Sequence, residues 1–154
     1  MPGPAHFHWC LKVLIGFALI GHFAALSFRP DALPALFILP YLPFLALVLA
    51  GGGVAIWHHG IMKRARRRAV KQPVLVCAGG LFNRIRHPIY LGDAVLYTAF
   101  AVYPATAVSL GLLAVALWAL HRQAEREDAE MAETFGQQHT AWRARTGRFW
   151  LRFC

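Results

Sequence analysis

The sequence contains few charged residues, and acidic residues are the scarcest of them. Its 154 residues include 7 acidic and 16 basic side chains; 15% of the chain is charged, whereas 58% is hydrophobic. A soluble domain of this length needs more polar surface to stay dispersed. The composition therefore excludes an ordinary soluble globular domain, and the length fits a single domain over residues 1–154.

Cysteine is also scarce, and its three positions form no pattern. Cys10, Cys77 and Cys154 are odd in number and lack paired spacing, so the sequence predicts neither a disulfide framework nor a zinc site, and no other metal site. Cys154 is the last residue of the sequence and does not begin a prenylation motif. We interpret the three cysteines as small apolar or interfacial side chains.

Two long blocks have almost no charge. Between Trp9 and Phe28 the only ionisable residues are Lys12 and His22, and residues 32–57 contain no charged residue at all. Each block is at least as long as the roughly 20 residues needed to cross about 30 Å of hydrocarbon. No basic segment precedes the first block and no small-residue cleavage motif closes it, so we expect a retained helix rather than a signal peptide.

A third apolar region covers residues 89–120 and is too long for one membrane helix. As a single helix it would measure roughly 48 Å at 1.5 Å per residue. Tyr103-Pro104 lies near its middle, and proline disfavours helix in the residue before it. We therefore expect a hairpin with arms at 90–103 and 104–121, each somewhat short for a straight span. The prediction is an all-α integral-membrane bundle of about four transmembrane helices, followed by a cytoplasmic C-terminal helix.

Basic residues are unevenly distributed along the chain. Fourteen of the sixteen lie at or after Lys63, whereas Arg29 is the only one in the connection between the first two blocks. Short basic segments beside membrane spans stay in the cytoplasm and attract anionic lipid headgroups. The charge of +9 is thus explained without a nucleic-acid partner. We expect a multi-pass protein of the bacterial inner membrane, in contact with membrane lipids, whose termini and active site face the cytoplasm.

The second apolar block holds two further signals. Pro34, Pro40 and Pro43 predict kinks, which membrane helices tolerate where neighbours satisfy the freed carbonyl groups. Gly51-Gly52-Gly53 predicts a close contact with another helix, because a glycine lets two backbones approach.

Two polar segments lie on the predicted cytoplasmic side. Residues 79–93 contain glycines suited to a tight turn and Pro88, which fits the first turn of a helix, where backbone N–H groups can face an anion. Residues 122–136 hold five of the seven acidic residues. Taken separately, the first segment is equally consistent with a polar loop whose arginines snorkel, and the second with a solvated helix end.

Together the two segments resemble one family. The pattern is Gly80, then Arg86-His87-Pro88-x-Tyr90-x-Gly92, then Glu127-Asp128-x-x-Met131-x-x-x-Phe135-Gly136-x-x-His139-x-x-Trp142. It resembles the isoprenylcysteine carboxyl methyltransferases and the related phospholipid N-methyltransferases, over residues 75–142 and in the family's order and spacing.

This chain departs from the family pattern at several positions. Leu81 and Phe82 stand where proline and tyrosine are usual, and Asp128 replaces a second glutamate. A leucine and two tyrosines of the pattern are replaced by Met131, His139 and Trp142. These departures affect the expected substrate and contacts more than the expected activity.

The resemblance implies S-adenosylmethionine as the methyl donor. Glu127 and Asp128 suit its ammonium group; Arg86, His87 or loop N–H groups suit its carboxylate; and Tyr90 covers the adenine or faces the sulfonium. The predicted cofactor-binding residues are Gly80, Arg86, His87, Pro88, Tyr90, Leu91, Gly92, Glu127 and Asp128. The predicted catalytic residues are Arg126, Glu127 and Tyr90.

The expected acceptor is lipophilic and enters between membrane helices. Prenylcysteine carboxylates, lipid headgroups, small thiols and quinol-like compounds all remain open, as does the oligomeric state. Methyl transfer needs alignment rather than a protein nucleophile. Two alternatives also remain: an NADPH-dependent membrane reductase of the sterol type, and a non-catalytic membrane protein that keeps the fold.

Two ionisable residues lie inside predicted membrane helices, where such residues are often functional. Asp93 follows Tyr90 by one turn, so it either caps the helix at the interface or contacts the acceptor. His22, near the centre of the first block, is expected to form a hydrogen bond between helices.

Overall fold

A computed structural model describes residues 4–69, 73–77 and 79–151 of the chain. The helices are α1 (Pro4–Phe28), α2 (Tyr41–Arg68), α3 (Pro88–Val102), α4 (Ala107–Phe135) and α5 (Gln137–Arg145), with short 3-10 turns η1 (Pro30–Ala32) and η2 (Gly80–Asn83). Over these ranges the only β pairing is in isolated bridges. The all-α prediction is confirmed.

Three helices are long and apolar enough to cross a membrane: α1 from Phe7, α2 and α4. The fourth predicted membrane helix, α3, is apolar but has 15 residues, which cover about 22 Å at 1.5 Å per residue. That length falls short of a hydrocarbon core of about 30 Å. The described helices thus support a membrane protein, with three helices of spanning length and a shorter one among them.

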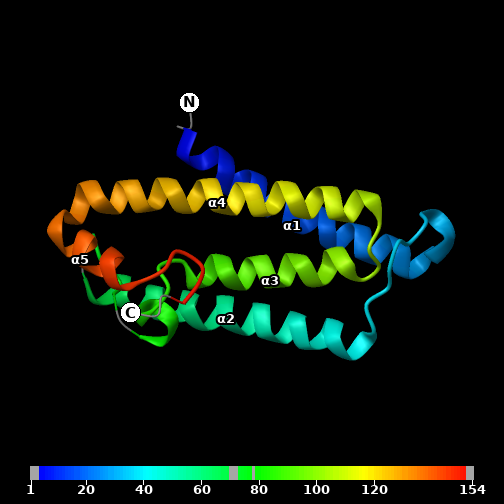
Figure 1. Cartoon of the computed structure of the whole chain (residues 1–154), viewed down its shortest axis with the longest axis horizontal. Helices are drawn as coiled ribbons and strands as arrows, with labels where there is room; N and C mark the ends of the chain where they lie inside the picture. The colour runs from blue at the N-terminus through cyan, green and yellow to red at the C-terminus, as the bar shows by residue number, and fades with distance from the viewer. Residues whose placement is uncertain (1–3, 70–72, 78, 152–154) are drawn as a thin grey trace.

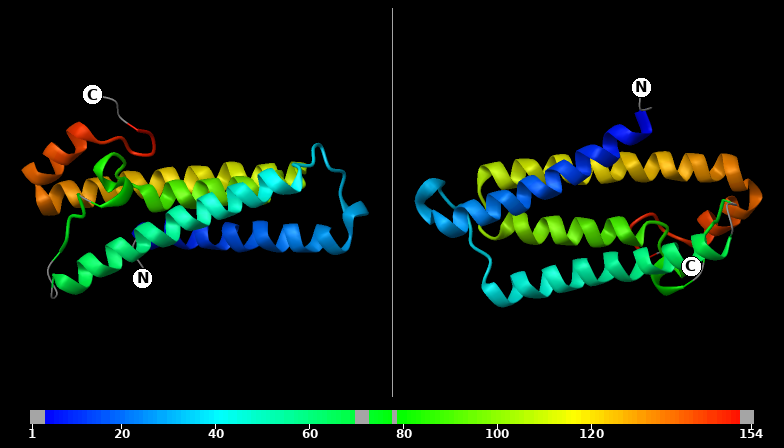
Figure 2. Two further views of the ribbon diagram at one scale, coloured as in Figure 1. Left: turned by 90° about the horizontal axis from the view of Figure 1, so that it is seen from below. Right: turned by 180° about the vertical axis from the view of Figure 1, so that it is seen from behind.

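The shorter helix lies between the others. α3 packs against α2 on one side and α4 on the other, and α1 lies against α4 and α3. Figure 1 and Figure 2 show the helices running lengthwise, with α1 and α2 inclined to α3 and α4, and with α5 and the start of α3 at the same end of the bundle. This end carries both sequence motifs.

Two glycines set the close contact between α2 and α3. A Cβ on Gly51 would lie 2.7 Å from the backbone nitrogen of Leu96, and a Cβ on Gly92 would lie 2.7 Å from that of Ala55. The predicted helix contact is therefore confirmed at Gly51, whereas Gly52 has open space. Gly92, predicted to bind the cofactor, packs on α2.

The prolines do not kink the second helix, so this prediction was wrong. Pro34 and Pro40 precede α2, which begins at Tyr41, and Pro43 lies in its first turn, where a missing N–H costs nothing. The preceding segment instead pairs with the α3–α4 turn, through the N–H of Leu36 to the carbonyl of Ala105 at 2.7 Å.

The predicted hairpin is confirmed. α3 ends at Val102 and α4 begins at Ala107, with Thr106 as N-cap in a capping box with Ser109. The side chains of His22 and Thr106 are 3.0 Å apart and form a hydrogen bond that ties α1 to this turn. The expectation of an interhelical bond for His22 is thereby confirmed.

At the opposite end, the segment after α5 returns to the start of α3. The N–H of Arg86 donates to the carbonyl of Gly147 at 2.9 Å, and that of His87 donates to the carbonyl of Arg148 at 3.2 Å. The Trp142 indole N–H donates to the carbonyl of Phe82 at 3.0 Å. These bonds bring residues 80–90 and 142–149 together, although they lie far apart in the sequence.

Candidate functional site

The turn before the Arg-His-Pro motif is held from α2 by a buried histidine. His58 Nε2 accepts a 2.8 Å hydrogen bond from the N–H of Leu81, while Nδ1 donates to the carbonyl of Val54 at 2.7 Å. Gly80 has φ of +54°, and a Cβ there would lie 2.6 Å from His58 Nε2. The positive φ of the turn and the close approach of His58 therefore both require glycine at position 80.

Pro88 is the first residue of α3, in the first turn as the sequence predicts, and His87 is its N-cap. This start fixes the phase of the helix, so that Tyr90 and Leu91 line a cavity while Gly92 faces α2. The motif therefore divides into residues that face open space and residues that hold the helix in place.

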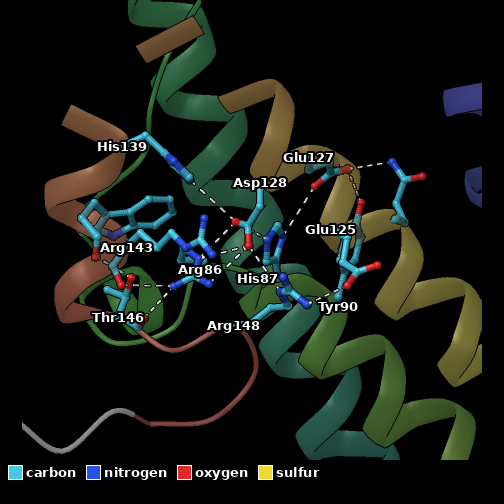
Figure 3. Close-up of polar contacts among 12 residues, drawn as sticks. Arg86, His87, Tyr90, Glu125, Glu127, Asp128, His139, Arg143, Thr146 and Arg148 are labelled. Carbon is cyan, nitrogen blue, oxygen red and sulfur yellow. Dashed lines mark hydrogen bonds and ion pairs between the residues drawn. The ribbon is translucent and has the colours of Figure 1, made fainter. Parts of the chain in front are cut away.

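Asp128, on α4, is the centre of a buried ion-pair network (Figure 3). Its carboxylate accepts hydrogen bonds from Arg86 Nε at 3.1 Å, His87 Nε2 at 3.1 Å and Arg148 Nε at 3.3 Å. His139 Nε2 lies 3.7 Å away. Two arginines and two histidines thus surround the Asp128 carboxylate.

Arg86 is equally occupied. Besides Asp128, it donates through Nη1 to the carbonyl of Thr146 at 2.6 Å, and it is buried. Arg86 and Asp128 were both predicted to contact the cofactor, but here each satisfies the other. The pair joins the loop, α4 and the segment after α5, and so positions the neighbouring residues.

Glu127 is the accessible carboxylate of the motif, with 35% of its side chain exposed. It accepts hydrogen bonds from the hydroxyl of Tyr90 and from Gln123 Nε2, the latter at 3.0 Å. The neighbouring Gln123 Oε1 is buried and has no hydrogen-bond partner. The amide of Gln123 thus bonds Glu127 through its nitrogen and keeps an unused acceptor oxygen.

His87 lies between the two carboxylates, with Nε2 facing Asp128 and Nδ1 3.6 Å from Glu127. Burial lowers the pKa of His87, but the hydrogen bonds to Asp128 and Glu127 raise it by more, so that the net pKa lies above its ordinary value. The site therefore favours the imidazolium, whose Nε2 donates to Asp128 while Nδ1 lies near Glu127.

The ring of Tyr90 stacks on His87, with the ring centroids 5.6 Å apart. Lys12 Nζ lies 4.2 Å from the Tyr90 centroid and forms a 3.0 Å ion pair with Asp93. Asp93, which the sequence predicted to lie inside a membrane helix, is thus paired with a lysine of α1, and this partner was not predicted. The cation over the Tyr90 ring comes from the protein itself.

An apolar cavity of about 470 Å³ adjoins this cluster. It is lined by Leu47, Tyr90, Leu91, Ala94, Val95, Thr98, Leu117, Leu120, His121, Phe149 and Trp150. Tyr90 belongs to both environments, because its ring lines the cavity and its hydroxyl donates to Glu127. Polar and apolar binding surfaces therefore meet at one residue.

The predicted catalytic residues are only partly brought together. Tyr90 and Glu127 are in direct contact, and Arg126 precedes Glu127 on α4 with its side chain partly exposed. The motifs did not indicate several participants, among them His58, Lys12, Gln123 and Arg148. The sequence alone could have singled out Lys12, because it is the one lysine within the first apolar block.

The described residues also bear on whether the protein can hold a metal ion. Over residues 4–69, 73–77 and 79–151, no group of three or more histidine, cysteine or acidic side chains is arranged to hold a metal ion.

Comparisons with known proteins find no match among protein-family models, curated proteins or solved structures.

Proposed function

We propose that the protein is an integral-membrane, S-adenosylmethionine-dependent methyltransferase that acts on a lipophilic acceptor. The observation that carries this proposal is the contact of Tyr90 with Glu127 at the boundary between a charged cluster and an apolar cavity. A reaction between a zwitterionic donor and an apolar acceptor needs such a boundary.

The residues fit the donor group by group. Glu127 and the unpartnered Gln123 Oε1 are acceptors for its ammonium, and the His87 imidazolium is a counter-charge for its carboxylate. S-adenosylmethionine supplies an activated methyl group when bound. The protein then needs only to bind and align the donor and the acceptor and to exclude water, so the proposed mechanism requires no protein nucleophile.

The remaining predicted residues act by positioning. The Arg86–Asp128 pair holds the loop against α4, Pro88 starts α3, and Gly92 allows α3 to lie against α2. Tyr90 and Leu91 face the cavity, where an acceptor with a long apolar chain replaces lipid contacts. The proposal thus assigns direct contact to Glu127, His87, Tyr90 and Leu91.

We further propose four membrane helices with both termini and the site on the cytoplasmic side of a bacterial inner membrane. The basic last turn of α2 and the arginines of α5 lie at the same end of the bundle as the site, as cytoplasmic retention of basic segments requires. Reporter fusions after Arg29 and after Trp150 should report opposite sides; the same side for both contradicts the topology.

Calorimetry of purified protein tests the function. We expect wild type to bind S-adenosylmethionine, and Glu127→Gln to weaken this binding roughly tenfold to over a hundredfold, because a charge-assisted hydrogen bond contributes about 1.5–3 kcal/mol. Glu133→Gln is the matched control, since it removes the same charge from an exposed position of the same helix. Binding of NADPH alone would instead support the reductase, and binding of neither a non-catalytic role.

A further inference from the structure

We infer that the acceptor enters the cavity with a neutral X–H group, where X is sulfur, oxygen or nitrogen, and that His121 removes its proton during methylation. The inference rests on the proposed function and deepens it. It narrows the acceptors to those that must lose a proton, and it assigns a catalytic base that lies outside both sequence motifs.

The residues that line the cavity indicate which acceptor groups it can hold. Among its described residues are no lysine, arginine, aspartate or glutamate, and the polar side chains are Tyr90, Thr98 and His121. An acceptor carboxylate buried here would face no cationic side chain of the lining, and an uncompensated buried charge is strongly disfavoured. A neutral thiol, phenol or amine carries no such penalty.

His121 is the lining side chain of the residue type that most often acts as a general base in enzymes. It lies on α4 and its ring is 6.3 Å from that of Phe149, which also lines the cavity. Half of its side chain is exposed. It therefore both lines the cavity and is accessible from outside it, as a base that takes a proton and releases it must be.

A carboxylate orients this histidine. Glu125, one turn further along α4, has Oε1 at 3.3 Å from His121 Nε2. Glu125 is itself held by Arg122 at 2.7 Å and by Arg148, from the segment after α5, at 3.5 Å. A histidine with one nitrogen on a fixed carboxylate presents the other nitrogen as the base. Here that nitrogen is Nδ1.

The reaction balances with these groups. The lone pair of X forms a bond to the methyl carbon as the carbon–sulfur bond of the donor breaks, and the electron pair of that bond stays on sulfur as a neutral thioether. The X–H proton passes to His121 Nδ1. The resulting imidazolium lies beside the Glu125 carboxylate and returns the proton to water.

The test uses the full-length protein in lipid nanodiscs with 1-octanethiol, 4-octylphenol and 4-octylaniline as neutral acceptors, and N-acetyl-S-farnesylcysteine as a carboxylate acceptor. We expect methylation of at least one neutral acceptor in preference to the carboxylate. His121→Gln should lower kcat at pH 7 roughly a hundredfold or more, without changing the affinity for S-adenosylmethionine.

The pH profile separates a base from a structural residue. With octanethiol, the rate of His121→Gln should rise about tenfold per pH unit below the thiol pKa, because hydroxide then removes the proton of the bound thiol in place of the histidine, and should approach wild type at high pH. His59→Gln, at an exposed position on α2, is the control and should match wild type.

Four outcomes overturn the inference. Preferred methylation of the carboxylate, or an equal loss in His121→Gln at every pH, does so while leaving the methyltransferase proposal standing. Retained donor binding without methylation of any neutral acceptor also does so. If wild type fails to bind S-adenosylmethionine, the proposed function fails, and the inference fails with it.

Discussion

The ammonium of Lys12 lies 4.2 Å from the centre of the Tyr90 ring, which links the first helix of the chain to the candidate site on the third. The same ammonium is paired with Asp93 at 3.0 Å, and the two side chains are 8% and 19% exposed. A cation in this position supports the tyrosine whose hydroxyl donates to Glu127.

The first prediction concerns this ion pair. Lys12→Met and Asp93→Asn should each lower the free energy of unfolding by about 3–5 kcal/mol, because each leaves one buried charge unpaired. The double variant Lys12→Met/Asp93→Asn should recover most of this loss, since it removes both charges. Chemical unfolding in detergent measures the three values; additive losses in the double variant would mean that the pair is not coupled.

The second prediction compares neighbouring glycines of α2. Gly51→Ala should destabilise the protein by about 1–3 kcal/mol, because its Cβ would enter the backbone of α3 at Leu96. Gly52→Ala should be neutral or stabilising, since its Cβ meets open space and alanine favours helix. Thermal unfolding of the two variants decides; equal melting temperatures would contradict the close contact.

A third prediction follows from the pKa of His87, which burial lowers and the hydrogen bonds to Asp128 and Glu127 raise by more. A histidine whose folded pKa is raised contributes stability in full below its unfolded pKa of about 6.5, and this contribution is lost as the pH rises through the folded pKa.

The difference in unfolding free energy between wild type and His87→Gln should therefore be largest near pH 6 and shrink with increasing pH. Unfolding curves between pH 6 and pH 9 measure it. A difference that stays constant over this range would show that the charge of His87 does not matter to folding.

The fourth prediction separates the two adjacent carboxylates of α4. Asp128→Asn should cost about 3–5 kcal/mol of stability, because it leaves the buried guanidinium of Arg86 without its counter-charge. Glu127→Gln should cost much less stability, because Glu127 is partly exposed. It should nevertheless weaken S-adenosylmethionine binding, so that its ratio of binding loss to stability loss is larger than that of Asp128→Asn. Parallel unfolding and calorimetry on both variants test this; similar stability losses would contradict the division of roles.

Local patterns in the sequence were sufficient for the helices, the hairpin and the start of α3. Long apolar runs, Tyr103-Pro104 and Pro88 act through the backbone of their own neighbours, so their effect can be predicted without the rest of the chain. The family-like spacing also placed Tyr90 and Glu127 among the residues of interest, and they are in contact.

Only the tertiary structure decided which side chains satisfy one another. Lys12 and Asp93 are 81 positions apart and Arg86 and Asp128 are 42 apart; their pairing depends on how the helices pack, which no local pattern encodes. The start of α2 was likewise decided from outside, because residues before it bond to the α3–α4 turn. The same packing placed Gly92 against α2 and left Glu127 accessible. Successive residues of a helix point in directions about 100° apart, so neighbours in the sequence have different surroundings once the helices pack.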